Sequence, residues 1–421
     1  MRKLVTYFPS ILVFTLIVWP DIVSRISDRQ FPVINIAGFG IRITEILFFF
    51  ILGIWVLSML HNKSTFFKKR LSTYYFGNSY ILFSILVFFI MFIQGILFNN
   101  VSNIFNDMRT LSYFLIIPVF QYYFYKKKYI FQSYKYICIM STFLFIGHLF
   151  FYKSNSQVIY MLFLFLFSMS LSTLILSKKY KFIFLLFSII ASLVLLLPMA
   201  KWLLLGILVT FTTIVLLQDN IITKVKIYTV SAFLLFLFIL LGGQLFIEAF
   251  INRSMQDWMA GRVMRNGGDL SSGRFQMWSE SFQNALQHPF WGQGIGYDFM
   301  PISRKIGFEY GIGEHSIIIY FLNRVGIVPT TILLYFLYKF FRFCVKLFKN
   351  ESDIKYKIMI LTGIGYFTGY FAICTVENFW KLFESVIILY FFVSMISSLH
   401  LFKTLTPFQN QILINHNTNK R

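Results

Sequence analysis

Residues 158–177 read VIYMLFLFLFSMSLSTLILS, a run of twenty residues without a charged side chain, and a basic loop containing Lys178, Lys179 and Lys181 follows it. An α-helix needs about 20 consecutive apolar residues to cross the hydrocarbon core of a bilayer. Strands and helices in the core of a soluble protein need shorter apolar runs. The stretch therefore predicts a transmembrane helix.

Runs of the same kind recur along the whole chain. Of its 421 residues 57% are hydrophobic, 20% are aromatic and 13% are charged, whereas a soluble domain carries about 25% charged residues. The fold predicted is an all-α integral membrane protein. Its twelve expected spans cover residues 4–20, 43–60, 78–98, 110–125, 135–152, 158–177, 182–198, 202–218, 227–246, 316–340, 357–376 and 383–402.

The formal net charge of +22 raises the question of nucleic-acid binding, but the positions of the basic residues favour another explanation. Cytoplasmic loops of membrane proteins carry an excess of Lys and Arg. If the chain starts inside, every strongly basic loop falls on the cytoplasmic side. These loops hold Lys63, Lys68, Lys69 and Arg70; Lys126, Lys127 and Lys128; Lys178, Lys179 and Lys181; Lys224 and Lys226; Arg342, Lys346 and Lys349; and Lys403, Lys420 and Arg421.

This topology divides the chain into four parts. Residues 1–246 hold about nine spans, 247–315 form a long external loop, 316–402 hold about three spans, and 403–421 form a cytoplasmic tail. Arg2 and Lys3 precede an apolar run that ends at Trp19 and resembles a signal peptide, but no small-x-small cleavage site follows, so we expect an uncleaved first span. The topology therefore predicts a multi-pass membrane protein with both termini on the cytoplasmic side.

The loop 247–315 is nearly neutral and is the segment long enough to form a small subdomain outside the membrane. Within it, Phe275, Trp278, Phe282 and Leu286 recur at spacings of three and four and predict one apolar stripe on a helix. Arg274 would lie in the first turn of that helix, where a cation opposes the helix dipole. Either an anion binds there, or the guanidinium points into water or pairs with a carboxylate.

The sequence HPFWGQGIG at 288–296 follows this helix. Pro289 is expected to end the helix, and Gly292 and Gly294 to form a tight loop after it. A Gly-x-Gly-x-Gly run can also cradle phosphate, but no strand precedes this one, so a structural turn is the better interpretation.

Four residues are candidates for chemistry at the external face. His315 immediately precedes a span, where the positive helix end keeps imidazole neutral and able to accept a proton; its alternative role is an interfacial anchor. Lys201 and Arg109 are external cations that break the positive-inside pattern, and each could instead be a snorkelling side chain. Together with Arg274, they form a set that suits a polyanionic headgroup such as a pyrophosphate.

The remaining polar residues suggest structural roles. Arg324 lies nine residues into a span, about 13 Å deep, where a charge is usually paired; Glu384 or Glu377 is its expected partner. Cys138, Cys344 and Cys374 lie in or beside apolar runs without a CxxC pair or a Cys/His cluster. Neither a disulfide, a metal site nor a cofactor is therefore expected.

Several of these motifs together resemble the signature of the O-antigen ligase and O-antigen polymerase superfamily. They are Gly273-Arg274 after Ser272, then Trp278, then His288-Pro289-x-x-Gly292-x-Gly294, and finally His315 before a span that contains Gly326. The resemblance covers about a fifth of the chain.

The resemblance implies a GT-C-like glycosyltransferase that works without metal and with inversion at the anomeric carbon. Its donor would be an undecaprenyl-diphosphate-linked glycan, with His315 acting on the acceptor and Arg274 holding the diphosphate. Lys201 occupies the place of a family arginine and lacks its bidentate grip; Ser316 replaces a common Asn. Arg109 has no counterpart in the resemblance and is a candidate only because it is a cation at an external span boundary.

The leading hypothesis is a polymerase that joins lipid-linked repeat units of a surface polysaccharide. The alternatives are a ligase that transfers finished glycan to lipid core or protein, and a flippase of lipid-linked glycans. A transporter tends to place charges within its spans and to show related halves, whereas here charged residues cluster at the external face beside one long loop and no repeated halves are seen. A chain-length regulator is a partner that the resemblance implies, and no nucleic-acid partner is expected.

Overall fold

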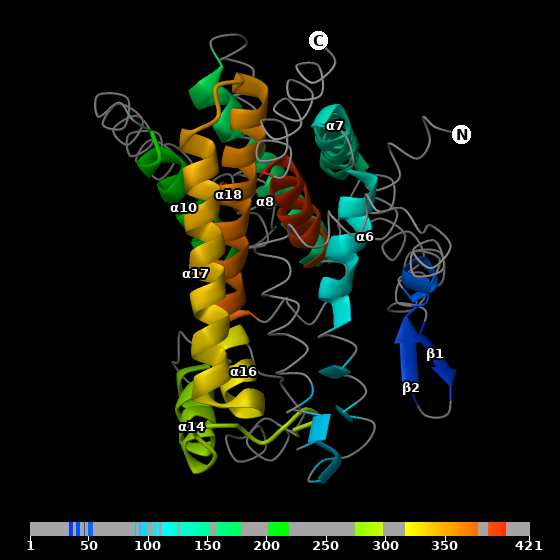
Figure 1. Ribbon diagram of the computed structural model, residues 1–421, viewed down its shortest axis with the longest axis vertical. Helices are drawn as coiled ribbons and strands as arrows, with labels where there is room; N and C mark the ends of the chain where they lie inside the picture. The colour runs from blue at the N-terminus through cyan, green and yellow to red at the C-terminus, as the bar shows by residue number, and fades with distance from the viewer. Residues whose placement is uncertain are drawn as a thin grey trace, which may run out of the picture.

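A computed structural model describes residues 33–36, 39–42, 46, 49–53, 89, 92–93, 95–97, 99, 103–104, 107–108, 112–124, 127–151, 157–177, 201–218, 274–297, 316–377 and 386–400. The described chain is helical, as predicted, apart from one antiparallel hairpin near the N-terminus (Figure 1). The hairpin pairs β1 (Val33–Ile36) with β2 (Phe39–Arg42), so that Val33 lies opposite Arg42.

Most of the described helices fall on expected spans. Their bounds are η1 Tyr113–Leu115, α6 Ile116–Tyr123, α7 Lys127–Phe151, α8 Gln157–Leu176, α10 Lys201–Leu216, α14 Arg274–Gln287, α16 Ile317–Val325, α17 Ile327–Lys349, α18 Ile354–Val376 and the helix Val386–His400. The spans expected at 4–20, 182–198 and 227–246 lie outside the described residues. Helix α7 begins before its expected span, so Lys127 and Lys128 belong to a helix and not to a loop.

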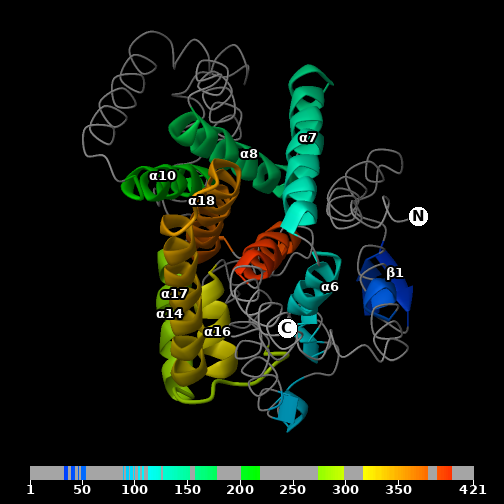
Figure 2. The same cartoon turned by 45° about the horizontal axis from the view of Figure 1, so that its top comes forward.

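Helix α18 is the centre of the assembly, with α8, α10 and α17 packed around it (Figures 1 and 2). Polar side chains of its neighbours bond to its backbone: Ser168 of α8 donates to the Thr362 carbonyl at 2.8 Å, and Thr210 of α10 donates to the Gly365 carbonyl at 3.0 Å. Hydroxyls of this kind satisfy backbone carbonyls across helices where water is absent.

Small residues let α10 and α18 approach closely. Gly365 and Gly369 are four residues apart on α18, which is the spacing of the small-xxx-small motif of packed membrane helices. A methyl group on Gly369 would clash with the Thr210 hydroxyl and lie 2.8 Å from the Gly206 carbonyl oxygen of α10. The backbones of α10 and α18 are therefore too close to accommodate a side chain at Gly369.

Within the described residues, α18 is the helix that is long and apolar enough to cross a membrane; shorter apolar helices cover Tyr160–Leu176, Trp202–Leu216 and Val386–His400. One such helix does not by itself distinguish a membrane protein from a soluble protein with an apolar core helix. The twelve spans stay a prediction.

The span expected at 316–340 is wrong in one respect, because it consists of two helices. Helix α16 ends at Val325, α17 begins at Ile327, and Gly326 between them adopts φ 78°. An L side chain rarely adopts this backbone conformation. The two helices consequently lie side by side instead of forming one rod (Figures 1 and 2).

We predict that Gly369→Ala lowers the melting temperature of the purified protein. The added methyl would overpack the α10–α18 contact, which typically costs about 1–3 kcal/mol. The matched control is Gly53→Ala, because nothing lies within 4 Å of a methyl at that helical position. Equal melting temperatures for the two variants would contradict close packing at Gly369.

Candidate functional site

The glycine loop after α14 is a structural turn, as the sequence predicted. Helix α14 ends at Gln287, directly before His288 and Pro289, and Gly292 donates its N–H to the His288 carbonyl at 3.0 Å. Gly292 and Gly294 have φ values of 65° and 83°. Glycine adopts these left-handed conformations at little cost.

The turn, residues 288–297, is fixed against the junction of α16 and α17. The N–H groups of Gln293 and Gly294 donate to the carbonyls of Asn323 and Arg324 at 2.7 and 2.9 Å. In return, Ile327 donates its N–H to the Pro289 carbonyl at 2.7 Å. The last carbonyls of α16 and the first N–H of α17 thus find partners that a broken helix leaves open.

Two glycines make this contact sterically possible. A Cβ on Gly292 would lie 2.5 Å from the Val325 nitrogen, and a Cβ on Gly326 would lie 2.5 Å from the Phe290 carbonyl. Both clashes are with backbone, which cannot rotate away. Gly292 is therefore needed at the turn, and Gly326 is needed at the helix junction.

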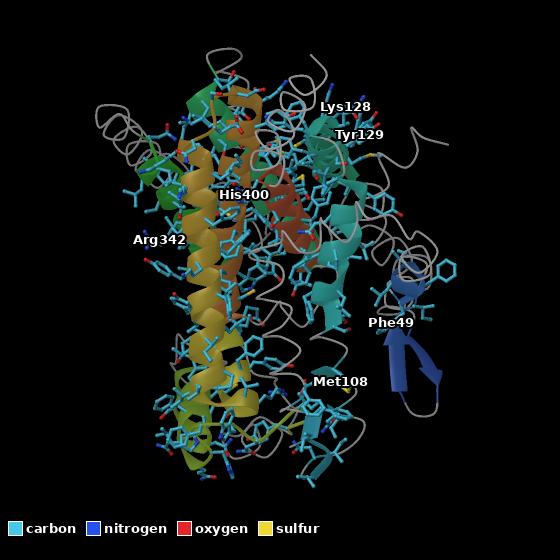
Figure 3. The ribbon with its side chains drawn as sticks, in the orientation of Figure 1. Phe49, Met108, Lys128, Tyr129, Arg342 and His400 are labelled. Atoms are coloured by element: carbon cyan, nitrogen blue, oxygen red, sulfur yellow. The ribbon has the colours of Figure 1, made fainter. Side chains whose placement is uncertain are left out.

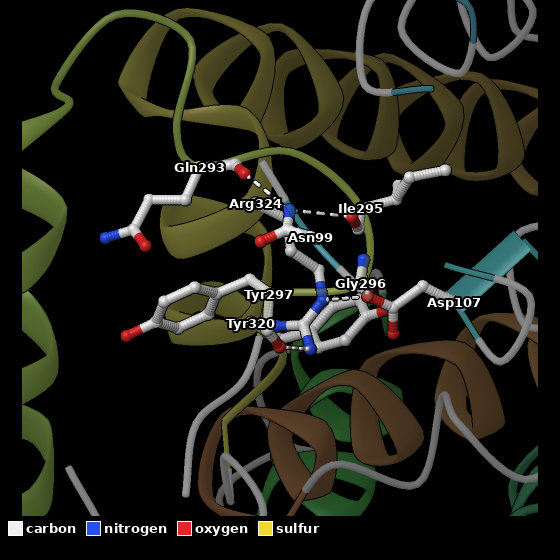
Figure 4. Close-up of polar contacts among 8 residues, drawn as sticks. All are labelled: Asn99, Asp107, Gln293, Ile295, Gly296, Tyr297, Tyr320 and Arg324. Carbon is white, nitrogen blue, oxygen red and sulfur yellow. Dashed lines mark hydrogen bonds and ion pairs between the residues drawn. The ribbon is translucent and has the colours of Figure 1, made fainter. Parts of the chain in front are cut away.

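A segment from the N-terminal half of the chain closes the other side of the turn. The Asn99 amide donates to the carbonyls of Gln293 and Ile295 at 2.8 and 2.9 Å (Figure 4). A Cβ on Gly296 would lie 2.6 Å from the Ile104 nitrogen, so this segment also packs on the turn. The turn is therefore held between the α16–α17 junction and a segment that precedes the turn by nearly 200 positions in the sequence.

A buried ion pair between Asp107 and Arg324 lies at the centre of this clamp (Figure 4). Arg324 Nε donates to Asp107 Oδ2 at 2.5 Å, and the two residues are 4% and 7% exposed. The carboxylate also accepts the Gly296 N–H at 2.8 Å and the Tyr320 hydroxyl at 2.9 Å. The expectation that Arg324 forms a structural ion pair is confirmed, with Asp107 as its partner, whereas Glu384 lies outside the described residues.

The guanidinium has further partners, which together fix its position. Arg324 Nη2 donates to the Tyr297 carbonyl at 3.2 Å, and its Cζ lies 4.0 Å from the Tyr320 ring centroid. A buried ion pair is stable when additional hydrogen bonds satisfy its remaining donors and acceptors. These contacts point to a structural role for Arg324 and not to a role in substrate binding.

Asp107, two positions before Arg109, was not among the partners expected for Arg324. The signal available was a carboxylate at the edge of an apolar run, in a chain with a deep arginine that needed a partner. Nothing in one sequence indicates which of several carboxylates meets Arg324, because the contact spans 217 positions.

The buried face of helix α14 differs from the apolar stripe that the sequence predicted for this helix. Met277, Ser281 and Ala285 are buried, whereas Phe282 and Leu286 of the stripe are 48% and 50% exposed. Asn284 donates its amide to the Tyr297 hydroxyl at 2.8 Å and to Asn323 Oδ1 at 3.3 Å. Helix α14 thus packs on α16 through small and polar residues.

Two predicted site residues are the first residues of described helices, and a third lies two positions before such a helix in the sequence. Lys201 is the first residue of α10, Arg274 is the first residue of α14, and α16 begins at Ile317, two positions after His315. The structure describes the backbone of Lys201 and Arg274, whereas Arg109, Gly273 and His315 lie outside the described residues. Trp278 is half-buried on α14, and His288 is exposed on the turn.

The contacts also orient these helix starts. Asn284 meets Asn323, and Gly292 abuts the last residues of α16, so α14 and α16 have their C-terminal ends together and their starts directed the same way (Figure 1). Near the start of α10, Gly206 packs against Ile373 in the last turn of α18. No group of three potential metal ligands occurs in the part of the chain that the structure describes.

A scan against protein-family models found no match to the chain, and a search of curated proteins found none either.

We predict that Asp107→Leu destabilises the protein more than the double variant Asp107→Leu/Arg324→Leu. The single change leaves a buried guanidinium without its carboxylate, a loss of about 3–5 kcal/mol, whereas replacing both partners by apolar residues costs less. Unfolding in detergent, followed by intrinsic fluorescence, measures the difference.

Asp353→Leu is the control for this experiment. Its partner Lys355 lies 3.4 Å away with both side chains exposed, and such surface pairs contribute about 0–1 kcal/mol. If Asp107→Leu and Asp353→Leu lower the free energy of unfolding by the same amount, the buried ion pair does not stabilise the fold as inferred.

Proposed function

We propose that the chain is a multi-pass membrane glycosyltransferase that polymerises lipid-linked repeat units of a surface polysaccharide at the external face of the bacterial cell membrane. Its donor is an undecaprenyl-diphosphate-linked glycan, and its acceptor is a sugar hydroxyl of another lipid-linked unit. The motif resemblance in the loop 247–315 and the helix starts at Lys201, Arg274 and Ile317 support this assignment.

The observation that carries the proposal is the placement of cations at helix starts. Lys201 opens α10 and Arg274 opens α14, and neither helix has an acidic residue in its first turn. The positive end of a helix dipole disfavours a cation and attracts an anion. A diphosphate bound between the free N–H groups and these side chains would turn the repulsion into attraction.

The distribution of charge along the molecule supports the topology. Lys127 lies 4.2 Å from the Tyr356 ring, so the start of α7 meets the start of α18 beside the basic end of α17. Lys128 lies at this end of the structure and Met108 at the opposite end, with α14 (Figures 1 and 3). Lys128, from a loop predicted to be cytoplasmic, thus lies at the opposite end from Met108 and α14, which are predicted to be external.

The proposed reaction requires a general base for the acceptor hydroxyl and cations for the leaving diphosphate. His315 accepts the proton of the acceptor hydroxyl, whose oxygen attacks the anomeric carbon of the donor. The bond from this carbon to the diphosphate oxygen breaks, and the lipid diphosphate leaves with the bonding electrons. Arg274, Lys201 and Arg109 stabilise the charge that develops on the leaving group.

Two other functions would draw on similar features. A ligase that transfers finished glycan to lipid core or protein shares the same motifs. A flippase for lipid-linked glycans is the candidate from another class, and it would need a charged route through the bundle. The buried Arg324 is the natural candidate for such a route, but its pairing with Asp107 favours a fixed structural role.

We predict that deleting the gene leaves single repeat units on undecaprenyl diphosphate and that His315→Ala fails to restore polymer. Without the base, the acceptor hydroxyl is a poor nucleophile, and general base catalysis typically contributes about 10²–10⁴-fold. Mass spectrometry of extracted lipid-linked glycans measures chain length. Long chains stranded on the lipid would indicate a ligase, and an unchanged profile would exclude both activities.

We predict that charge alone is needed at Lys201 but that geometry also matters at Arg274. Lys201→Arg should retain polymer, Lys201→Gln should lose it, and Arg274→Lys should be weaker than wild type because lysine lacks the bidentate fork. The measurement is polymer yield at matched protein levels. Arg342→Gln is the control, because Arg342 is an exposed cation on α17 near the opposite end; equal losses at Arg342 and Arg274 would contradict a local role.

A further inference from the structure

The exposed face of α14 carries large apolar side chains that continue into the turn after it. Phe282 is 48% exposed, Leu286 50%, Phe290 64% and Trp291 50%. Single exposed apolar residues are ordinary on a protein surface, but a contiguous group marks a surface that contacts something other than water. We call these four residues the α14 strip.

The α14 strip is continuous with the exposed face of α17. The Pro289 carbonyl accepts the Ile327 N–H at 2.7 Å, and the backbone of Phe290 and Trp291 abuts Gly326. Ile327 and Val328, each 40% exposed, therefore begin where the strip ends. From there the exposed apolar residues of α17 continue through Ile332 and Leu334 to Tyr335 and Tyr338.

The far end of this face has the character of a membrane boundary. Lys339 Nζ lies 5.2 Å from the Tyr335 ring centroid, and Arg342 Cζ lies 5.9 Å from that of Tyr338. Tyrosines and long cations are typical of the level where the hydrocarbon core meets the headgroups. Beyond them, the exposed residues of α17 include Lys346 and Lys349.

The length of the apolar face decides what else must lie in the bilayer. Ile327 and Tyr338 are eleven residues apart, a rise of about 16 Å at 1.5 Å per residue. The hydrocarbon core is about 30 Å thick. The exposed apolar face of α17 thus covers about half of it, and the α14 strip lies at the end where the other half is needed (Figure 1).

We propose that the α14 strip is embedded in the outer leaflet, with Phe282, Leu286, Phe290 and Trp291 in contact with lipid acyl chains. Helix α14, which runs in the same direction as α16 (Figure 1), would then contribute to the lipid-facing surface and would not belong to a loop exposed to water. This inference rests on the multi-pass topology of the proposed function.

The polar face of α14 fits this location. Its exposed polar residues Ser279, Gln283 and Gln287 are uncharged, and Glu280 on the same helix is partly buried. Uncharged amides and hydroxyls can hydrogen-bond to headgroups and interfacial water without the cost of bringing a charge close to hydrocarbon. Gln283 is a matched control for Phe282, because the two residues are adjacent in the sequence and Gln283 does not belong to the α14 strip.

The test is spin-label accessibility in lipid nanodiscs, starting from the full-length chain with Cys138, Cys344 and Cys374 replaced. Single cysteines at Phe282, Leu286, Gln283 and Gln287 carry the label, and Ile332→Cys on α17 reports on the bilayer itself. We expect labels at Phe282 and Leu286 to shift towards oxygen accessibility, as at Ile332. Labels at Gln283 and Gln287 should shift towards the water-soluble nickel reagent.

Each alternative outcome is decisive. If Ile332 is lipid-accessible while Phe282 and Leu286 respond to nickel, the strip faces water and the inference fails without affecting the multi-pass topology. If Phe282 and Leu286 are inaccessible to both reagents, a protein surface covers them and the inference again fails. If Ile332 also responds to nickel, the topology under the proposed function is itself wrong.

Discussion

Arg324 holds a positive charge where almost no solvent reaches it, and the Asp107 carboxylate 2.5 Å away makes this possible. An arginine buried without a partner would be very costly, so the segment around residue 107 and α16 must meet whenever the chain is folded. The same carboxylate accepts the Gly296 N–H and the Tyr320 hydroxyl. One acidic residue therefore joins three segments that are far apart in sequence.

The glycine turn depends on this junction and completes it. A helix broken at Gly326 leaves carbonyls at the end of α16 and an N–H at the start of α17 without intrahelical partners. Gln293, Gly294 and Pro289 supply those partners. A Cβ added to Gly292 or to Gly326 would lie about 2.5 Å from backbone atoms of the other segment. The turn and the helix break therefore fit together only because both positions are glycine.

Much of the helical organisation was predictable, because long apolar runs determine where helices lie regardless of their neighbours. The turn at 288–297 was also predictable, since Pro289 and the glycines act locally. The break at Gly326 was not, because an apolar run of 25 residues looks the same whether it is one helix or two. The partner of Arg324 depends on tertiary contact and escaped the sequence for the same reason. The sequence GYFTG, with Gly365 and Gly369 four residues apart, is a local pattern that predicts a close helix contact such as the one between α10 and α18.

The apolar stripe on α14 was predicted correctly as one face of a helix, but Phe282 and Leu286 of that stripe are exposed and not buried. Period and spacing identified Phe282 and Leu286 as one face of a helix, but the protein buries the neighbouring face through Met277, Ser281 and Ala285. A soluble helix with this sequence would be expected to bury its largest apolar residues first. Burying Ser281 and Ala285 while Phe282 and Leu286 are exposed is the arrangement expected where the surroundings are themselves apolar, because close packing and not hydrophobic burial then decides which face contacts the neighbouring helix. With its C-terminal end fixed to α16 by Asn284 and the turn, α14 has little freedom left. The backbone at its start, Arg274, is consequently held by contacts at the other end of the helix, which is the preorganisation that the proposed anion-binding role would require.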